Sequence, residues 1–233
     1  MNTSFYTAAV GALSQERGLE ITANNVANLS TDGYKPDQAS FADLVYTSVR
    51  NAGTKPEVGH GDALWKTDTV FSAGGLKRTD RKQDYALVSD NAFFAVQRGD
   101  GSIRYTRNGG FRLSEQADGS FLLCDSNGNR VLDGAGSPIP VKDADAKQPV
   151  GVFSFQNMGG LVKSGGNDFT ATDISGSAVP VKDAEVKQGY LENSATDLAD
   201  EMSNMISTQR AFEFNSKMVK ISDEIMQTLN NLR

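Results

Sequence analysis

The C-terminal stretch of the chain constrains the fold most, because it contains no residue that breaks a helix. Neither Gly nor Pro occurs between Leu191 and Arg233. Apolar residues recur there at every seventh position, in two adjacent rows. The first row is Leu198, Met205, Phe212, Val219 and Met226, and the second is Ala211, Met218, Ile225 and Leu232. These rows predict a helix over roughly 195–232, within a C-terminal segment 191–233, whose apolar face is broad enough for more than one neighbour.

The start of this helix has suitable chemistry. We expect Ser194 or Thr196 to be its N-cap, because a side-chain hydroxyl can accept a hydrogen bond from the first free backbone amides. Asp197, Asp200 and Glu201 follow. Their carboxylates suit the positive end of the helix dipole.

A second helix is predicted at the N-terminus, over roughly 1–32 within a segment 1–35. Phe5, Ala12, Leu19 and Val26 recur at every seventh position, with Ala8, Ala9, Ala23 and Leu29 beside them. The stripe is narrow and rich in small residues, so another helix can approach it closely. Asn24, Asn25 and Asn28 weaken the helix, because asparagine side chains compete for backbone hydrogen bonds. Gly33 is the expected left-handed cap.

The middle of the chain, 66–190, differs in kind. Short apolar segments alternate there with turn dipeptides, as where Phe93–Val96 is followed by Gly99-Asp100-Gly101. Asp-Gly and Asn-Gly turns predict an antiparallel β-rich domain. Residues 36–65 are expected to be an extended or loop linker. Phe41, Leu44, Val45 and Val49 are spaced there for a helical turn or two, ahead of a loop at 51–56.

The predicted fold class is therefore α+β, with a central antiparallel β-rich domain between two terminal helices. We expect the N- and C-terminal helices to pack together as a coiled-coil-like helical domain in the assembled state. Small residues facing bulky ones reach the packing density of protein interiors. The alternative is that each helix docks on the β domain of its own chain. In a dilute monomer the ends are expected to be mobile, because isolated helices are marginally stable.

Composition and charge exclude several function classes. The chain has 233 residues, a net charge of −6 and a pI near 4.9, which argue against a nucleic-acid binder. Residues 1–16 hold no Lys or Arg, so we expect no cleaved signal peptide. No apolar run reaches the length of a membrane span. We accordingly expect no direct insertion into a membrane.

The residue patterns of common enzymes and metal sites do not occur. Cys124 is the single cysteine and His60 the single histidine, and we expect no nucleophile–base pair between them. Asp125-Ser126-Asn127 resembles the opening of a calcium loop, but Arg130 stands where that loop needs Gly. The carboxylate pairs Asp143/Asp145 and Asp183/Glu185 fit solvated strand ends better than glycoside hydrolysis. We expect no catalytic, cofactor-binding or metal-binding residues.

Three segments resemble one family. Ala23-Asn24-Asn25-Val26-Ala27-Asn28 with Thr31-x-Gly33-Tyr34-Lys35 is similar to the N-terminal motif of the bacterial flagellar rod and hook proteins. Segment 188–194 with Glu201-Met202, Met205-Ile206 and 209–217 is similar to the C-terminal motif of that family. Tyr105–Gly109 resembles its core-domain motif. Asp43-Leu44-Val45-Tyr46 makes the chain most similar to rod subunits, of the distal-rod type or the FlgF type.

The resemblance implies a structural subunit of the flagellar basal-body rod. Such a subunit is exported unfolded through the flagellar type III apparatus, without a cleaved signal peptide. It then assembles outside the cytoplasmic membrane with copies of itself and other rod and hook subunits, into a hollow helical shaft that transmits torque from motor to hook. The expected assembly interface is Phe5, Ala8, Ala12, Leu19, Asn24, Asn25, Val26, Asn28, Gly33, Leu198, Met202, Met205, Phe212, Met218, Val219, Ile225 and Met226.

Two other functions remain open on the sequence. One is an envelope enzyme that acts on the cell wall, although no triad, metal cluster or acid pair supports it. The other is a helical interaction protein or export chaperone, which would not need a sizeable β domain.

Overall fold

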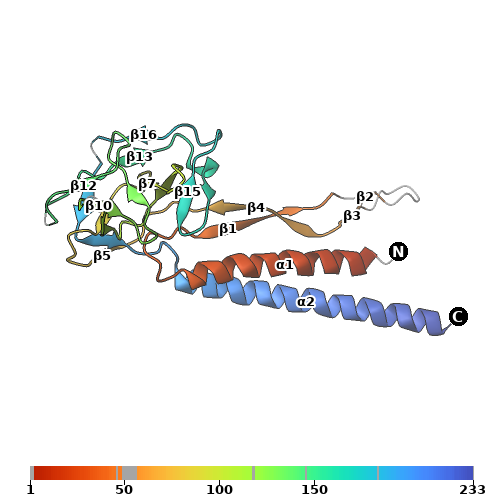
Figure 1. The fold of residues 1–233 in the computed structure, drawn as a ribbon. Helices are drawn as coiled ribbons and strands as arrows, with labels where there is room; N and C mark the ends of the chain where they lie inside the picture. Colours follow the sequence, from red (N-terminus) through yellow and green to blue (C-terminus); the bar gives the residue numbers. More distant parts are fainter. Residues whose placement is uncertain are drawn as a thin grey trace. The chain divides into compact units, whose positions relative to one another are not determined.

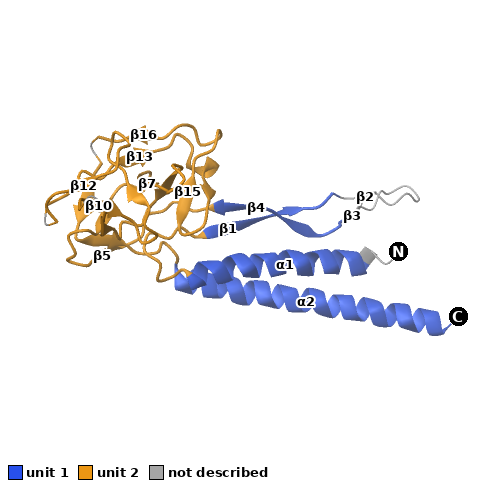
Figure 2. Cartoon of the chain, viewed as in Figure 1, with its two compact units in different colours: residues 1–27, 37–68, 197–233 blue, residues 28–36, 69–196 orange. Residues whose placement is uncertain are grey.

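A computed structural model describes residues 3–45, 47–48, 57–116, 119–144, 146–182 and 184–232. The predicted loop at 51–56, Val49, Asp145 and Asp183 lie outside these residues. The chain forms two compact units (Figure 2). Unit 1 comprises residues 1–27, 37–68 and 197–233, and unit 2 comprises 28–36 and 69–196. Both units are discontinuous in sequence, because the chain leaves and re-enters each of them.

Unit 1 contains the two long helices and a β ribbon (Figure 1). Helix α1 spans Thr3–Ala27 and helix α2 spans Leu198–Asn231. The ribbon pairs β1 (Asp37–Asp43) with β4 (Asp62–Thr69), and β2 (Thr47–Ser48) with β3 (Glu57–Val58). α1 contacts both α2 and β1. The predicted terminal helices are confirmed.

Unit 2 is an antiparallel β structure, as predicted. Its main sheet runs in the order β12-β10-β11-β7-β8-β15-β14, with β9 on β10 and with β13 joining β7 to β16. These strands are β7 (Phe93–Gln97), β8 (Ile103–Thr106), β9 (Arg112–Glu115), β10 (Phe121–Cys124), β11 (Arg130–Val131), β12 (Pro140–Val141), β13 (Val152–Ser154), β14 (Val162–Lys163), β15 (Asp168–Thr170) and β16 (Val179–Pro180). Two further pairs are β5 (Leu76–Arg78) with β18 (Tyr190–Glu192) and β6 (Tyr85–Leu87) with β17 (Val186–Gln188). A short 3-10 helix, η1, spans Met158–Gly160.

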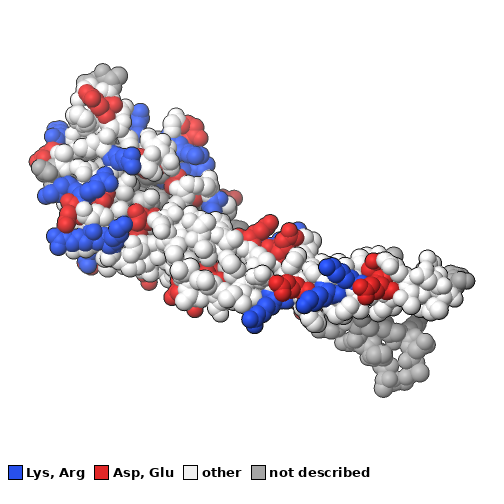
Figure 3. Space-filling view, turned by 90° about the horizontal axis from the view of Figure 1, so that it is seen from below, with Lys and Arg blue, Asp and Glu red and all other residues white. Residues whose placement is uncertain are grey.

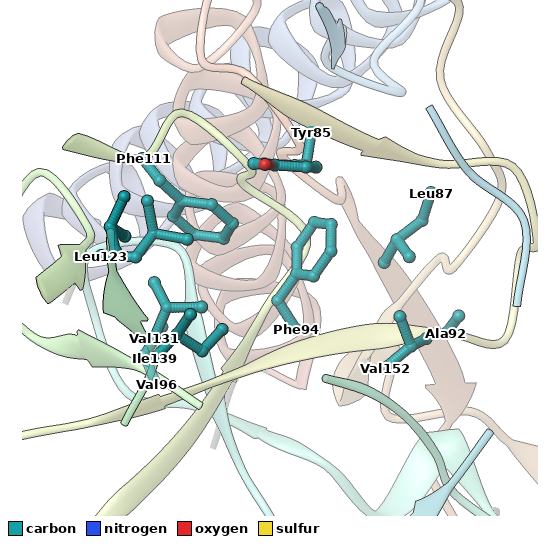
Figure 4. Packing of buried hydrophobic residues seen from close by; sticks show 11 residues of the cluster. Tyr85, Leu87, Ala92, Phe94, Val96, Phe111, Leu123, Val131, Ile139 and Val152 are labelled. Carbon is teal, nitrogen blue, oxygen red and sulfur yellow. The ribbon is translucent and has the colours of Figure 1, made fainter. Parts of the chain in front are cut away.

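Strand β7 lies at the centre of unit 2 and is buried on both faces. Its alternating side chains contribute to two apolar clusters, which explains why Phe93–Val96 reads as a continuous apolar run. Phe94 packs edge-on against Phe111 in the first cluster (Figure 4). Phe93 packs against Phe155 and Phe169 in the second.

Three local predictions are wrong. Phe41 lies in strand β1 and not in a helical turn, because 37–43 pairs with β4. α1 ends at Ala27, so Gly33 does not cap it, although Gly33 does have a left-handed backbone with φ 70°. The N-cap of α2 is Asp197, whose side chain accepts from the amides of Ala199 and Asp200. A carboxylate caps as well as a hydroxyl and also neutralises the dipole.

Candidate functional site

The two terminal helices of unit 1 run antiparallel and pack directly against each other (Figure 1). Three contacts fix their register. A Cβ added at Gly11 would lie 2.9 Å from Nδ2 of Asn215, and one at Gly18 would lie 3.5 Å from Cγ2 of Thr208. Asn25 donates from Nδ2 to Oε1 of Glu201 over 2.8 Å. Each contact is seven residues from the next on both helices, so the same faces meet along their length.

Small and polar residues form the centre of this contact on α1. The buried positions of the helix are Ala8, Gly11, Ser14, Gly18, Thr22 and Asn25. The facing positions of α2 are Glu201, Met205, Thr208, Phe212, Asn215, Val219 and Ser222, which are buried or half-buried. Within the single chain, small residues of α1 do pack against bulkier residues of α2, and the same packing in the assembled state stays a prediction. The two helices are therefore partners within one chain, whereas the expected mobility of the ends in a dilute monomer stays a prediction.

The N-terminal residues that were predicted to form the interface occupy different parts of α1. Ala8 and Asn25 are buried, and Asn24 is exposed. The predicted stripe of Phe5, Ala12, Leu19 and Val26 is half-buried throughout. It therefore forms a flank and not the centre of the helix contact, because only the smaller residues beside it permit close approach. Asn28 and Gly33 belong to unit 2, where they are half-buried and buried.

The C-terminal residues that were predicted to form the interface separate into two groups. Met205, Phe212, Met218 and Val219 are half-buried, and the first row faces α1 in the middle of the helix. Leu198, Met202, Ile225 and Met226 are exposed. Contact with α1 thus covers only part of the apolar surface of α2. This agrees with the broad apolar face predicted from the two rows of α2.

Asn25 connects three elements of unit 1. Besides its bond to Glu201 on α2, its Nδ2 donates to the carbonyl oxygen of Asp37 over 2.7 Å, and its Oδ1 accepts from the amide of Asp37 over 2.9 Å. Burial raises the pKa of the Glu201 carboxyl, and the bond from Asn25 opposes that shift. The asparagine that seemed to weaken the helix instead attaches α1 to the start of β1 and to α2.

Unit 2 contains a buried ionic cluster. The carboxylate of Glu192 binds Nζ of Lys35 at 2.7 Å and Nε of Arg107 at 2.8 Å, and all three side chains are fully buried. Arg107 also donates to the carbonyl oxygens of Ser89 and Ala92 at 2.6 and 2.7 Å. Such a network satisfies buried charges that would otherwise be costly.

Two opposing effects set the pKa values in this cluster. Burial by itself raises the pKa of Glu192, but the hydrogen bonds and charge of Arg107, with the charge of Lys35, outweigh it and hold that pKa below its ordinary value. Burial lowers the pKa of Lys35, and the charge of Glu192 opposes this. Glu192 is therefore the anion on which both cations depend.

The ionic cluster brings together the three segments that carry the family resemblance. The amide of Gly33 donates to the backbone oxygen of Glu192 over 2.7 Å. A Cβ at Gly33 would lie 2.6 Å from the carbonyl carbon of Arg107, so only glycine fits there. The sequence motifs contain Lys35, Arg107 and Glu192, but no local pattern indicates that they pair, because 72 and 85 residues separate them. Sequence reasoning missed this cluster.

Cys124, the single cysteine, is buried in unit 2. Burial raises the pKa of the Cys124 thiol. A cavity of about 350 Å³ beside it is lined by polar groups, including Arg98, Arg130 and Gln116. Over the described parts of the chain, no three residues from His, Cys, Asp and Glu come together as a possible metal site. The described helices also include none with the length and apolar character required to cross a bilayer.

Comparison with known proteins identifies the family. Three family models match consecutive parts of the chain: flagella basal body rod protein over residues 5–35, the flagellar hook protein FlgE/F/G D1 domain over 87–190, and the flagellar basal body rod FlgEFG protein C-terminal region over 187–232. The flagellar basal-body rod protein FlgG of Buchnera aphidicola from Acyrthosiphon pisum is 33% identical, and the match covers 100% of both chains. The chain belongs to the FlgG-type flagellar basal-body rod protein family.

Other relatives give the same assignment. FlgG of Bacillus subtilis is 30% identical over 100% of both chains. FlgF of Mesorhizobium japonicum is 28% identical over 99% of both. The chain is thus a structural subunit of the flagellar basal-body rod and assembles with other rod and hook subunits. The segments that resemble the rod-family motifs lie partly around Glu192 and partly within helices α1 and α2.

Proposed function

We propose that this subunit assembles into a hollow helical shaft that transmits torque, with the α1–α2 pair forming the wall of the shaft. The supporting observation is the set of apolar side chains that the pair leaves exposed. Leu198, Met202, Ile206, Ile225 and Leu229 all lie on α2 and are exposed in the single chain. A surface of this kind marks an interaction site. A contact between unlike surfaces that does not close on itself generates a helical filament.

We also propose that the helix pair is a two-stranded antiparallel coiled coil. Its contacts recur at intervals of seven residues on both helices, as a coiled coil requires. Small α1 residues at the centre let the axes approach closely. A stiff helical pair suits a part that carries load, because large and multivalent contacts resist separation.

Membership of the rod family supports a proposal on export and location. The subunit is proposed to leave the cell unfolded through the flagellar type III apparatus and to assemble outside the cytoplasmic membrane. Its role is proposed to be structural and not enzymatic, since the family is one of structural rod proteins.

Electron microscopy of the concentrated, pure chain tests the assembly proposal. Hollow helical polymers are the expected result. A gene deletion that leaves rods complete and cells motile would overturn the proposal. Cell-wall hydrolysis by the pure chain would favour the enzyme alternative, and binding of an unfolded export substrate without polymers would favour a chaperone.

A further inference from the structure

Helix α2 extends beyond the beginning of α1 (Figure 1). The register that pairs Gly11 with Asn215 brings Ser4 level with Ser222. α2 continues from there to Asn231, about two and a half further turns. We call this part of α2, residues 223–232, the α2 extension. Its apolar side continues the face of α2 that packs on α1, and the described part of α1, which begins at Thr3, does not reach past residue 223 to cover it.

The α2 extension is apolar on that side and has no charge in its last turns. Ile225, Met226, Leu229 and Leu232 are 52%, 51%, 59% and 80% exposed. Met226 continues the row of Met205, Phe212 and Val219 that faces α1. In Figure 3, the white atoms between the last acidic side chains of the helix pair and its grey tip belong to uncharged residues. Such a face requires a partner in water.

Helix α1 carries a matching stripe on its outer side. Tyr6, Val10 and Leu13 are 54%, 37% and 51% exposed and point away from α2. Both stripes span seven residues, and in an antiparallel alignment their inner residues, Val10 and Leu229, lie within one residue, about 1.5 Å, of the same level. Each stripe is therefore about 10 Å long. An antiparallel arrangement brings Leu13 to Ile225, Val10 to Leu229 and Tyr6 to Leu232.

Charge favours this alignment over its reverse. Arg17 lies one turn beyond Leu13 on α1, and Glu224 lies just before Ile225 on α2. Both side chains are exposed, and neither forms an ion pair among the residues that the structure describes. The antiparallel alignment brings these opposite charges to the same end of the contact, where they would steer the two surfaces together.

We propose that the α2 extension of one copy docks antiparallel on Tyr6, Val10 and Leu13 of a second copy of this chain. The inference rests on the proposed assembly and deepens it by naming the two surfaces. The contact joins unlike surfaces, so each copy keeps one free stripe for the next and the chain of contacts stays open. Leu13 is level with residue 213 of its own chain, so the second copy is displaced along the helix axis by about 18 Å.

Disulfide cross-linking tests this contact. In a Cys124→Ala background, one chain carries Leu13→Cys and a second, differently tagged chain carries Ile225→Cys. Within one chain these positions are about 18 Å apart, beyond the roughly 7 Å that a disulfide spans, so any bond joins two copies. The control replaces Ile225→Cys by Met202→Cys, which is equally exposed at 52% but lies near the other end of α2.

Basal bodies isolated from cells that express both chains should contain the Leu13–Ile225 cross-link and not the control cross-link. Equal yields for both pairs would overturn the inference. So would preferential joining of two Ile225→Cys chains, which would mean that two α2 extensions pair symmetrically, or a cross-link to a different rod or hook subunit in place of this chain.

A charge exchange gives a second test. Arg17→Glu and Glu224→Arg alone should each lower the cross-link yield about tenfold, because like charges then meet, and the double variant should restore it. Arg210→Glu is the control, because Arg210 is exposed on α2 about 22 Å before Ile225, and it should have little effect. Normal rods without the cross-link, or no rescue by the double variant, would overturn the inference and leave the proposed function standing. Complete rods after deletion of the gene would overturn the proposed function itself.

Discussion

Glu192 is the residue on which two buried cations depend. Its carboxylate binds Lys35 and Arg107 and also accepts the amide of Gly74 at 2.8 Å. Removing one partner of a buried ion pair lowers the free energy of unfolding far more than removing one partner of an exposed pair. The reason is that the remaining buried charge is not solvated. In this cluster, the loss of one anion leaves two cations in the interior of unit 2.

We predict that Glu192→Gln destabilises unit 2 by about 3 to 5 kcal/mol. Chemical denaturation followed by circular dichroism measures the change. Glu185→Gln is the matched control, because Glu185 lies 3.9 Å from Lys187 on the surface, where both side chains are largely exposed. The control should change stability by no more than about 0.5 kcal/mol. Equal effects of the two variants would contradict a structural role for the cluster.

The low pKa of Glu192 also predicts a pH dependence. The folded state lowers this pKa below the ordinary value of 4.5, so it binds the proton less readily than the unfolded state does. The resulting stability is present above the unfolded pKa and is lost as the pH falls through the folded value. Acid unfolding below about pH 4.5 should therefore be weaker in Glu192→Gln than in the unchanged chain.

Asp168 should show the opposite behaviour. Burial, with the charge of Asp125, raises its pKa to about 6. Its ionised form therefore opposes folding at neutral pH, and stability falls as the pH rises from about 4 to 6. We predict that Asp168→Asn stabilises the chain by roughly 1 to 3 kcal/mol at pH 7.5 and leaves it unchanged at pH 4. Denaturation midpoints at the two pH values would measure this, and a loss of stability at pH 7.5 would contradict it.

At the level of elements, the α1–α2 contact depends on the small residues of α1. Gly11 faces Asn215, and Gly18 lies against both Phe41 and Thr208. A large side chain at either position would separate the helices along several turns. Glycine costs about 1 kcal/mol within a helix relative to alanine, so close packing must offset that cost here.

We predict that Gly11→Leu lowers the melting temperature of the helix pair, despite the better helix propensity of leucine. The physical reason is steric: Gly11 is buried, a Cβ there would already lie 2.9 Å from Nδ2 of Asn215 and require that side chain to move, and a leucine side chain requires still more room. Ala23→Leu is the matched control, because Ala23 is exposed on the same helix. It should be neutral within about 0.5 kcal/mol. Helical circular dichroism during heating measures both variants, and equal melting temperatures would refute the contact.

The whole molecule combines two units whose cores are chemically different. Unit 2 has two buried aromatic and aliphatic clusters and the Glu192 cluster, whereas unit 1 relies on the paired helices and on the ribbon. The two units should therefore respond separately to substitutions. A charge placed between α1 and α2 disturbs the monomer before it disturbs any contact between subunits.

We predict that Phe212→Asp unfolds the helix pair while unit 2 stays folded. Phe212 is half-buried against α1, so the new carboxylate would lose solvation. Phe214→Asp is the control, because Phe214 is 64% exposed on the same helix. Hydrogen exchange should show lost protection in 3–27 and 198–231 only for Phe212→Asp. Loss of protection throughout unit 2 would show that the units do not fold separately.

Periodicity alone was sufficient to predict the elements that repeat. The heptad rows of the C-terminal segment and the turn dipeptides between 93 and 128 predicted α2 and the antiparallel strands, because such signals depend on neighbours in sequence. Residues 37–43 contain no such local signal, because a strand of a ribbon is defined by the strand with which it pairs. The helical turn expected there was therefore wrong.

By itself, the sequence determined the two terminal helices, the β-rich middle and the motifs of the flagellar rod family. Only the tertiary structure decided which face of α1 meets α2. The apolar stripe of Phe5 and Leu19 is the more conspicuous pattern, yet the smaller residues beside it let the axes approach and so form the centre. The tertiary structure also decided that Lys35, Arg107 and Glu192 form one cluster. Charges so far apart in sequence find each other only when a common core removes them from water, and no local pattern records that condition.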